Sequence, residues 1–158
     1  MKRFSLFLLL LVAIKVQSQS LKIIGETELN ASFQAGAKTR IVNFWATWCK
    51  PCVEEMPLFF KADSLLGEEV EFVFVSFDML KDSGRVNRKI AELKMPGTQY
   101  LVKVKDMDAL INGVDSLWGG ALPVTWRIKE GLRIGKYESF EQFDDLRGFI
   151  EDNIKKEE

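Results

Sequence analysis

The sequence predicts an α/β protein with a central mixed β-sheet flanked by helices on both faces. Two observations lead to this fold class. Apolar runs typical of buried strands alternate with segments in which apolar residues recur about every 3.6 residues, an order typical of parallel strands connected by helices. Near the end of the chain, two further strand-like runs flank a short turn and predict an antiparallel hairpin at the side of this sheet.

The strand signals of the first half differ in strength. Residues 21–33 mix β-branched and polar side chains and predict an edge strand, whereas residues 41–45 (IVNFW) form a short apolar run typical of a buried strand. Residues 49–66 carry apolar side chains at helical spacing, and Pro57 is expected to interrupt and kink this helix because proline has no N–H. Residues 70–77 (VEFVFVSF) are too apolar to leave either face exposed, which predicts a central strand.

Three further helices are predicted in the second half. Ser83 is expected to cap a helix over residues 84–94, which Met95-Pro96-Gly97 ends. Residues 107–114 predict a short helix, and residues 140–154 predict a final amphipathic helix.

The hairpin is predicted between the last two of these helices. Residues 124–128 (VTWRI) and 132–137 (LRIGKY) are the strand-like runs, and Lys129-Glu130-Gly131 separates them as a turn. Trp118 and Trp126 near this region are expected to pack in the core.

Composition limits the classes of protein to which the chain can belong. The 158 residues are 47% hydrophobic and 11% aromatic, which is enough for the core of one domain. The formal net charge is −1, so nothing attracts the protein to phosphate backbones, and no nucleic-acid partner is expected.

The start of the chain resembles an export signal in its pattern. A basic start at residues 1–3 precedes an apolar run over residues 4–14, which is typical of a secretory signal peptide. This run is shorter than the roughly 20 residues that a membrane-spanning helix needs. We therefore expect residues 1–18 to be a cleaved signal peptide, and residues 19–158 to be a single domain that is soluble in the periplasm or elsewhere outside the cytoplasmic membrane.

Both cysteines lie in WATWCKPC, residues 45–52. A structural disulfide between them would close a loop of four residues and stabilise the fold by only about 2 kcal/mol. A zinc site needs two further ligands, but the chain has no histidine and no other cysteine, so a metal could bind only between chains or with carboxylates. Covalent haem attachment requires a histidine after the second cysteine, where this chain has Val53. We therefore expect neither a metal nor a cofactor.

Redox chemistry is the interpretation that the surroundings of the pair favour. Cys49 follows a predicted strand and begins a predicted helix, where backbone N–H groups and the helix dipole favour a thiolate. Cys49 is therefore the expected nucleophile. Cys52 lies three residues later on the same helical face, from which it can attack a mixed disulfide formed at Cys49.

The run VNFWATWCKPC with EEMP after it, within residues 42–57, resembles the thioredoxin superfamily, and in particular its exported TlpA/ResA-like branch of thiol-disulfide oxidoreductases. The resemblance extends over residues 27–155 and implies the thioredoxin fold, with the CxxC motif at the start of the first long helix. It also implies an enzyme that reduces cysteine-containing exported proteins, often in cytochrome c maturation, and that a membrane thiol electron donor recharges. We expect the protein to be a monomer.

The same resemblance implies three residues of a substrate site. Pro123 matches the family's cis-proline that faces the disulfide, and the backbone of Leu122 before it would bind the substrate chain. An ordinary trans proline at the start of an edge strand is the alternative. Trp48 matches an exposed aromatic residue beside the disulfide and is a candidate docking residue, whereas Trp45 is expected in the core.

An acid near the deeper thiol is the last implied residue. Thioredoxins proper have a buried Asp six residues before the first cysteine, where this chain has Asn43. The TlpA/ResA-like branch instead resembles this chain in having Glu55, three residues after the second cysteine. On a helix this carboxylate would stack beneath Cys52, where burial would raise its pKa and let it accept the proton of that thiol. The alternative is a solvated helix carboxylate, as we expect for Glu54.

The leading hypothesis is thus an exported enzyme that reduces protein disulfides through a mixed disulfide at Cys49, which Cys52 resolves. Two alternatives stay open: a peptide-binding module of the same fold without redox turnover, and an oxidase that introduces disulfides. A peroxidase of related fold is disfavoured, because the chain lacks the Thr or Arg setting that such an enzyme places around its thiol.

Overall fold

The computed structural model describes residues 20–34, 36, 38–103, 106–115 and 118–151, so the predicted signal peptide over residues 1–18 lies outside the described residues. A six-stranded sheet forms the middle layer, in the order β1-β4-β3-β2-β5-β6. The strands are β1 (Lys22–Ile24), β2 (Thr39–Trp45), β3 (Val70–Ser76), β4 (Thr98–Val102), β5 (Val124–Lys129) and β6 (Leu132–Lys136). The helices are α1 (Glu26–Ser32), α2 (Lys50–Leu66), α3 (Ser83–Leu93), α4 (Met107–Val114) and α5 (Phe143–Glu151), with a 3₁₀ turn over Leu80–Asp82.

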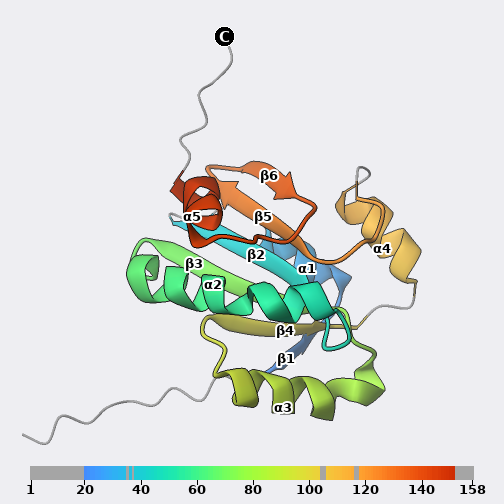
Figure 1. Ribbon diagram of the computed structural model, residues 1–158. Helices are drawn as coiled ribbons and strands as arrows, with labels where there is room; N and C mark the ends of the chain where they lie inside the picture. Colours follow the sequence, from blue (N-terminus) through green and yellow to red (C-terminus); the bar gives the residue numbers. More distant parts are fainter. Residues whose placement is uncertain (1–19, 35, 37, 104–105, 116–117, 152–158) are drawn as a thin grey trace, which may run out of the picture.

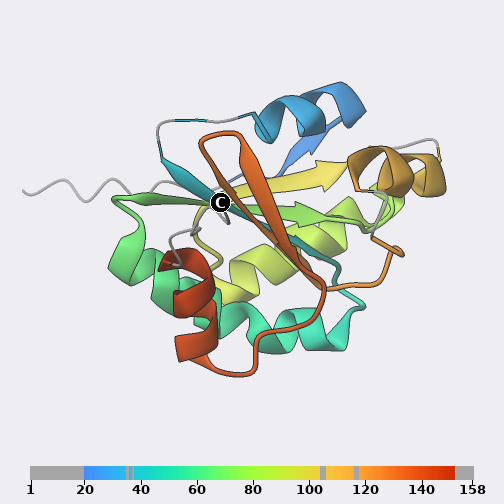
Figure 2. The ribbon, with the colours of Figure 1, turned by 90° about the horizontal axis from the view of Figure 1, so that it is seen from above.

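The sheet is mixed, as predicted. Strands β1, β4, β3 and β2 pair in parallel, whereas β5 is antiparallel to β2 and β6 is antiparallel to β5. Figures 1 and 2 show α2, α3 and α5 on one face of the sheet and α1 and α4 on the other. The central position of β2 and β3 confirms the predictions for residues 41–45 and 70–77, and the architecture is the predicted thioredoxin fold.

Two apolar clusters cover the two faces, because successive side chains of a strand point to opposite sides. In β2, Ile41 and Trp45 pack beneath α2, whereas Val42 and Phe44 pack on the other face. The second face holds an aromatic group whose ring centroids lie 4.7 to 6.3 Å apart. Its members are Phe33, Phe44, Phe77, Trp118 and Trp126, so both tryptophans belong to the core, as predicted.

The segment over residues 21–33 is only partly the predicted strand. β1 is an edge strand, but most of the segment is helix α1, which the sequence analysis missed. Gly25 stands at the start of this helix, and its N–H donates to the Glu28 carboxylate at 2.6 Å. Leu29 is the only buried residue of α1, so the sequence shows no apolar periodicity there.

Strand β4 is a second element that the sequence analysis missed. It begins with Thr98 and Gln99, and the polar start hides its strand character. The Gln99 side chain is buried all the same, and its Nε2 donates to the carbonyl of Pro96 at 2.6 Å. The strand conformation of β4 depends on its pairing with β3 on one side and with β1 on the other. Neither partner is close to β4 in the sequence.

Several boundaries differ from the predictions. Asp82 rather than Ser83 occupies the N-cap of α3, and α5 begins at Phe143 rather than at Phe140. Helix α2 continues through Pro57, so the predicted interruption is wrong. Helix α4 has the predicted bounds, and the hairpin turn places Glu130 and Gly131 at φ values of 50° and 80°.

Candidate active site

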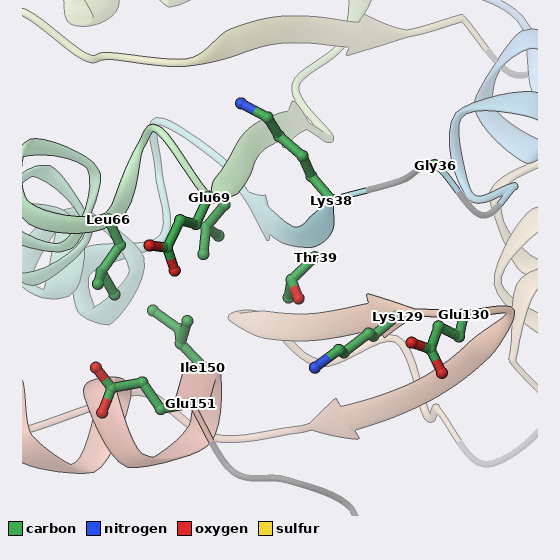
Figure 3. A pocket seen from close by; sticks show the side chains of 10 residues that line it. Gly36, Lys38, Thr39, Leu66, Glu69, Lys129, Glu130, Ile150 and Glu151 are labelled. Carbon is green, nitrogen blue, oxygen red and sulfur yellow. The ribbon is translucent and has the colours of Figure 1, made fainter.

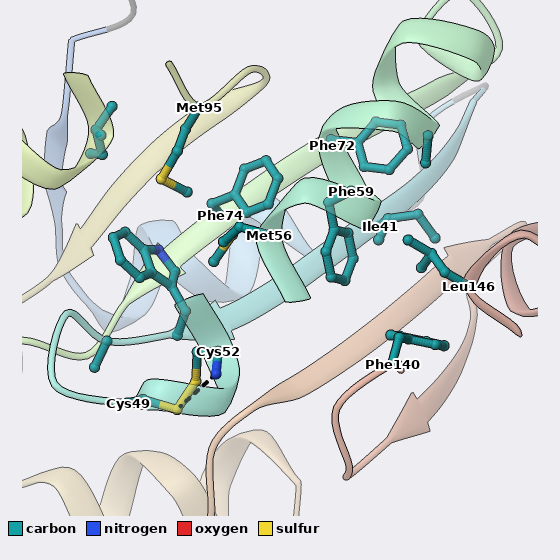
Figure 4. Close-up of a cluster of buried hydrophobic side chains, with 14 of the residues drawn as sticks. Ile41, Cys49, Cys52, Met56, Phe59, Phe72, Phe74, Met95, Phe140 and Leu146 are labelled. Carbon is teal, nitrogen blue, oxygen red and sulfur yellow. Dashed lines mark hydrogen bonds between the residues drawn. A yellow bond between two sulfur atoms is a disulfide. The ribbon is translucent and has the colours of Figure 1, made fainter. Parts of the chain in front are cut away.

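The two cysteines form a disulfide at the start of α2 (Figure 4), with their Cα atoms 5.3 Å apart. Cys49 is the N-cap residue of the helix, and its Sγ accepts a hydrogen bond from the backbone N–H of Cys52 at 3.3 Å. Cys49 is 5% exposed and Cys52 is completely buried. Of the two cysteines, only Cys49 therefore has any surface that solvent contacts.

The electrostatics of the helix start favour a thiolate at Cys49. Its sulfur accepts the Cys52 N–H and lies at the positive end of the helix dipole, both of which stabilise a negative charge on that sulfur once the disulfide is reduced. Pro51 fits the first turn, where its missing N–H removes no helical hydrogen bond. The exposed Lys50 ammonium lies 3.4 Å from the Glu54 carboxylate, so Glu54 is the solvated helix carboxylate that we expected.

Glu55 belongs to α2 and lies on the buried face of this helix, with 2% of its surface exposed. Its Oε1 accepts from the Asn43 side-chain amide and its Oε2 accepts from the backbone N–H of Phe140, each at 2.9 Å. Desolvation raises the pKa of the carboxyl from 4.5 to about 7, although these two hydrogen bonds and the Lys136 charge act in the opposite direction. Half of these groups are therefore protonated near neutral pH.

Asn43 connects Glu55 to the sheet. This residue pairs with Thr125 across β2 and β5, and its amide nitrogen donates to the Thr125 hydroxyl at 3.0 Å as well as to Glu55. Where thioredoxins have a buried Asp, this chain thus has the Asn43 amide as a hydrogen-bond donor. The amide directs the Glu55 carboxylate toward β2.

A shallow pocket of about 350 Å³ adjoins Glu55. It is lined by side chains from α2 and from the segment before α5, among them Pro51, Glu54 and Phe140. The pocket offers a route along which a proton can pass between the buried carboxyl and solvent.

The predicted substrate residues lie at the same end of the sheet. Pro123 is buried, its bond to Leu122 is cis as expected, and the next residue, Val124, pairs with Phe44 near the end of β2. Leu122 packs against both core clusters, one of which contains the two cysteines. Trp48 is 64% exposed beside Cys49, whereas Trp45 is buried.

Asp78 is a residue of this region that the sequence analysis missed. It is 2% exposed, follows β3 and accepts hydrogen bonds from Thr47, which lies in the turn before Cys49. A signal was available: parallel strands β2 and β3 end at the same edge of the sheet, so an acid after β3 lies near the turn after β2.

A larger pocket of about 470 Å³ lies at the opposite end of the sheet (Figure 3). Thr39 and Val70 at the starts of β2 and β3 and Lys129 at the end of β5 contribute to its lining. None of the predicted site residues is among the described residues that line it, so this pocket is separate from the cysteine site.

In the part of the chain that the structure describes, no helix is long and apolar enough to cross a membrane.

Comparisons with known proteins agree with this geometry. Thioredoxin-like protein YneN of Bacillus subtilis (strain 168) is 34% identical over 78 residues, which cover 49% of this chain and 46% of YneN. The chain thus matches less than half the length of that relative.

Two solved structures share the fold at low sequence identity. A thiol:disulfide interchange protein from Chlorobium tepidum TLS aligns with a TM-score of 0.61 at 18% identity, over 77% of this chain and 81% of that one. A secreted disulfide oxidoreductase of Mycobacterium tuberculosis aligns with a TM-score of 0.58 at 20% identity, over 76% and 84%.

A family model places the chain more directly. The thioredoxin model matches residues 20–112, a segment that contains the CxxC motif and extends from β1 into α4. Since this match covers more than half of the sequence and the fold, the disulfide at the N-terminus of α2 and the cis-proline all agree with it, the chain belongs to the thioredoxin family.

Proposed function

We propose that the protein is a thiol-disulfide oxidoreductase that reduces disulfide bonds in protein substrates. One observation carries the proposal: the Cys49–Cys52 disulfide lies at a helix N-terminus, with Cys49 5% exposed and Cys52 completely buried. A structural disulfide would need neither this difference in exposure nor a sulfur that accepts a backbone N–H. Both features serve a nucleophile and a resolving thiol.

The reaction consists of two exchanges. In the reduced protein, the Cys49 thiolate attacks a substrate disulfide, a Cys49–substrate disulfide forms, and one substrate thiolate leaves. The Cys52 thiolate then attacks the Cys49 sulfur, and the second substrate thiolate leaves. Two electrons pass to the substrate, the Cys49–Cys52 disulfide forms, and a thiol donor must reduce it before the next cycle.

Glu55 is proposed as the proton acceptor for Cys52. The two residues are three apart on α2, which places them on one side of the helix, and both are buried. A carboxyl whose pKa is about 7 is half ionised at neutral pH, so it can accept the thiol proton and then release it. The pocket beside Glu55 supports that release.

The site of action is proposed to lie outside the cytoplasmic membrane. The basic and apolar start of the sequence supports export, and one of the similar structures is that of a secreted disulfide oxidoreductase. The proposed substrates are cysteine-containing exported proteins, apocytochrome c among them, and the proposed reductant is a membrane thiol electron donor. The protein is proposed to act as a monomer.

Insulin reduction tests the activity itself. Catalytic amounts of the protein are expected to accelerate the reduction of insulin by dithiothreitol, which is followed as turbidity. An absence of acceleration would contradict the proposed oxidoreductase activity. It would favour the alternative hypothesis of a peptide-binding module without redox turnover.

The reduction potential tests the direction of electron flow. A reductase is expected to have a Cys49–Cys52 potential of roughly −270 to −200 mV, the range of thioredoxin and glutaredoxins. Equilibration with glutathione buffers of known composition, with the reduced fraction measured by alkylation and mass spectrometry, gives this value. A potential near about −120 mV would contradict the reductase and support the disulfide-introducing oxidase.

Substrate docking at Trp48 predicts a separate effect. Trp48→Ala is expected to raise the KM for insulin roughly tenfold, because an exposed aromatic side chain that becomes buried on binding contributes on the order of 1 to 2 kcal/mol. The reduction potential is expected to stay unchanged.

Leu132 provides the matched control for Trp48. It is 49% exposed and begins β6, at the end of the sheet away from the disulfide. Leu132→Ala is expected to leave the KM at the wild-type value. Equal KM values for all three proteins would exclude Trp48 from docking.

A further inference from the structure

The turn that connects β2 to α2 is held by a side chain from another strand end. The backbone N–H of Cys49 donates to the carbonyl of Ala46 at 3.1 Å, which makes Thr47 and Trp48 the central residues of the turn. The Asp78 carboxylate binds Thr47 twice: Oδ2 accepts from the Thr47 N–H at 2.8 Å and Oδ1 accepts from its hydroxyl at 2.5 Å. Backbone and side chain of Thr47 are therefore fixed together.

Asp78 is itself held firmly. The Ser76 hydroxyl donates to Oδ2 at 2.9 Å, and the Arg85 guanidinium lies 3.2 Å from Oδ1. The side chain of Asp78 is completely buried, and a buried carboxylate is stable only while charged and polar donors surround it. Leaving the hydrogen bonds of this buried carboxylate unmade would cost free energy. Asp78 therefore keeps the turn in one conformation.

That conformation decides where Cys49 lies. Cys49 is both the last residue of the turn and the N-cap of α2, so the place of its sulfur relative to the Cys52 N–H depends on the turn. Residue Trp48, beside it, owes its 64% exposure to the same conformation.

We propose that Asp78 is a positioning residue, which holds Thr47 and thereby fixes the turn that presents Cys49 to a substrate disulfide. This proposal rests on the proposed oxidoreductase function. Asp78 acts through its two hydrogen bonds to Thr47, so its contribution is to the geometry of attack and not to proton transfer.

Thr47→Val tests the proposal without changing any charge. The variant loses the hydroxyl contact with Oδ1 and retains the size of the side chain. We expect the rate constant of the reduced protein with oxidised glutathione to fall about tenfold, since small misplacements of a reacting group cost factors of this order or more. The pH midpoint for alkylation of Cys49 by iodoacetamide is expected to rise, because the sulfur is less well placed at the helix N-terminus.

Thr47→Ser is expected to restore both values, because it restores the hydroxyl. Thr47→Ala removes the same hydroxyl from a partly buried position without adding a methyl group, and it is expected to match Thr47→Val. Asp82→Asn is the control: it removes the second carboxylate near Arg85, at 3.5 Å, whereas the carboxylate that binds Thr47 is that of Asp78. Wild-type reactivity is expected for Asp82→Asn.

Unfolding in urea separates positioning from a general structural role. If Thr47→Val and Thr47→Ala are less stable but keep the wild-type rate and alkylation midpoint, Asp78 serves stability alone and the proposal is wrong. Alkylation does not depend on catalysis, so it still tests positioning if the wild type proves inactive with insulin, a result that would instead contradict the proposed function.

Discussion

Cys52→Ser is expected to accumulate as a mixed disulfide with its substrate, and Cys49→Ser is expected to be inactive. Attack by Cys52 on the mixed disulfide is intramolecular, so its loss should slow release of the substrate on the order of a thousandfold or more. Cys49→Ser lacks the nucleophile, and Cys52 cannot replace it because Cys52 is completely buried. The two variants therefore separate capture from release.

Insulin reduction and non-reducing electrophoresis measure the two effects. Cys49→Ser should reduce insulin at the rate of dithiothreitol alone. Cys52→Ser should give a covalent adduct with the substrate, and dithiothreitol should cleave this adduct by reducing its disulfide bond. Expression of the full-length Cys52→Ser chain should trap the physiological substrates for mass spectrometry. The reverse pattern, with adducts on Cys49→Ser only, would exchange the roles of the cysteines, and equal activity of Cys49→Ser and wild type would favour the peptide-binding module.

The cysteine pair was predictable from sequence because its chemistry depends on local structure. A strand, a two-residue spacing and a helix start within ten or so residues determine which sulfur lies at the N-cap, and short-range signals of this kind are read directly. The cis bond before Pro123 was expected only from the family resemblance. The composition of the segment does not reveal it, since proline is compatible with either isomer.

Burial of polar side chains could not be derived from the pattern of residues, and for Glu55 only the family resemblance implied it. Glu54 and Glu55 are adjacent in a helix, yet one pairs with Lys50 in solvent and the other is held by Asn43 and by a backbone N–H from beyond β6. Asp78 reaches Thr47 across a separation of 31 residues. Such contacts follow from the order of strands in the sheet, which the pattern of apolar residues does not determine.

The missed elements have the same physical origin. β4 contains polar residues at its start, and its strand conformation depends on pairing with β3 and β1. Helix α1 buries only Leu29, so local periodicity could not distinguish it from an edge strand. By contrast, β3 is apolar on both faces, and its central position was evident from composition alone.

Glu55→Gln is expected to slow the resolving step about 100-fold at pH 8, a typical contribution of a general base. In the wild type, the rate should rise with pH through about 7 as the Glu55 carboxyl loses its proton. The amide can neither accept nor release a proton, so the rise near pH 7 should disappear from the variant. Stopped-flow measurement of Trp fluorescence during oxidation of the reduced protein, from pH 5 to pH 9, gives both profiles.

The stability of the same variant gives a second, independent measurement. The folded wild type binds a proton at Glu55 between pH 4.5 and about 7 that the unfolded chain does not bind, because burial raises the pKa. The free energy of unfolding therefore falls as the pH rises through this window, by about 3 kcal/mol. Glu55→Gln has no such group, so urea unfolding of the oxidised protein at pH 5 and pH 8 should show that this decrease is missing.

Glu54→Gln is the matched control, because it makes the same substitution one residue earlier on a side chain that is 62% exposed. It should keep the wild-type rate profile and the wild-type pH dependence of stability. If Glu55→Gln lost the pH dependence of stability and kept the wild-type rates, Glu55 would be a buried acid without a part in resolution. If both variants behaved as the wild type does, the carboxyl would have to be ionised across the whole range. That outcome would overturn both the raised pKa and the role that we assign to Glu55.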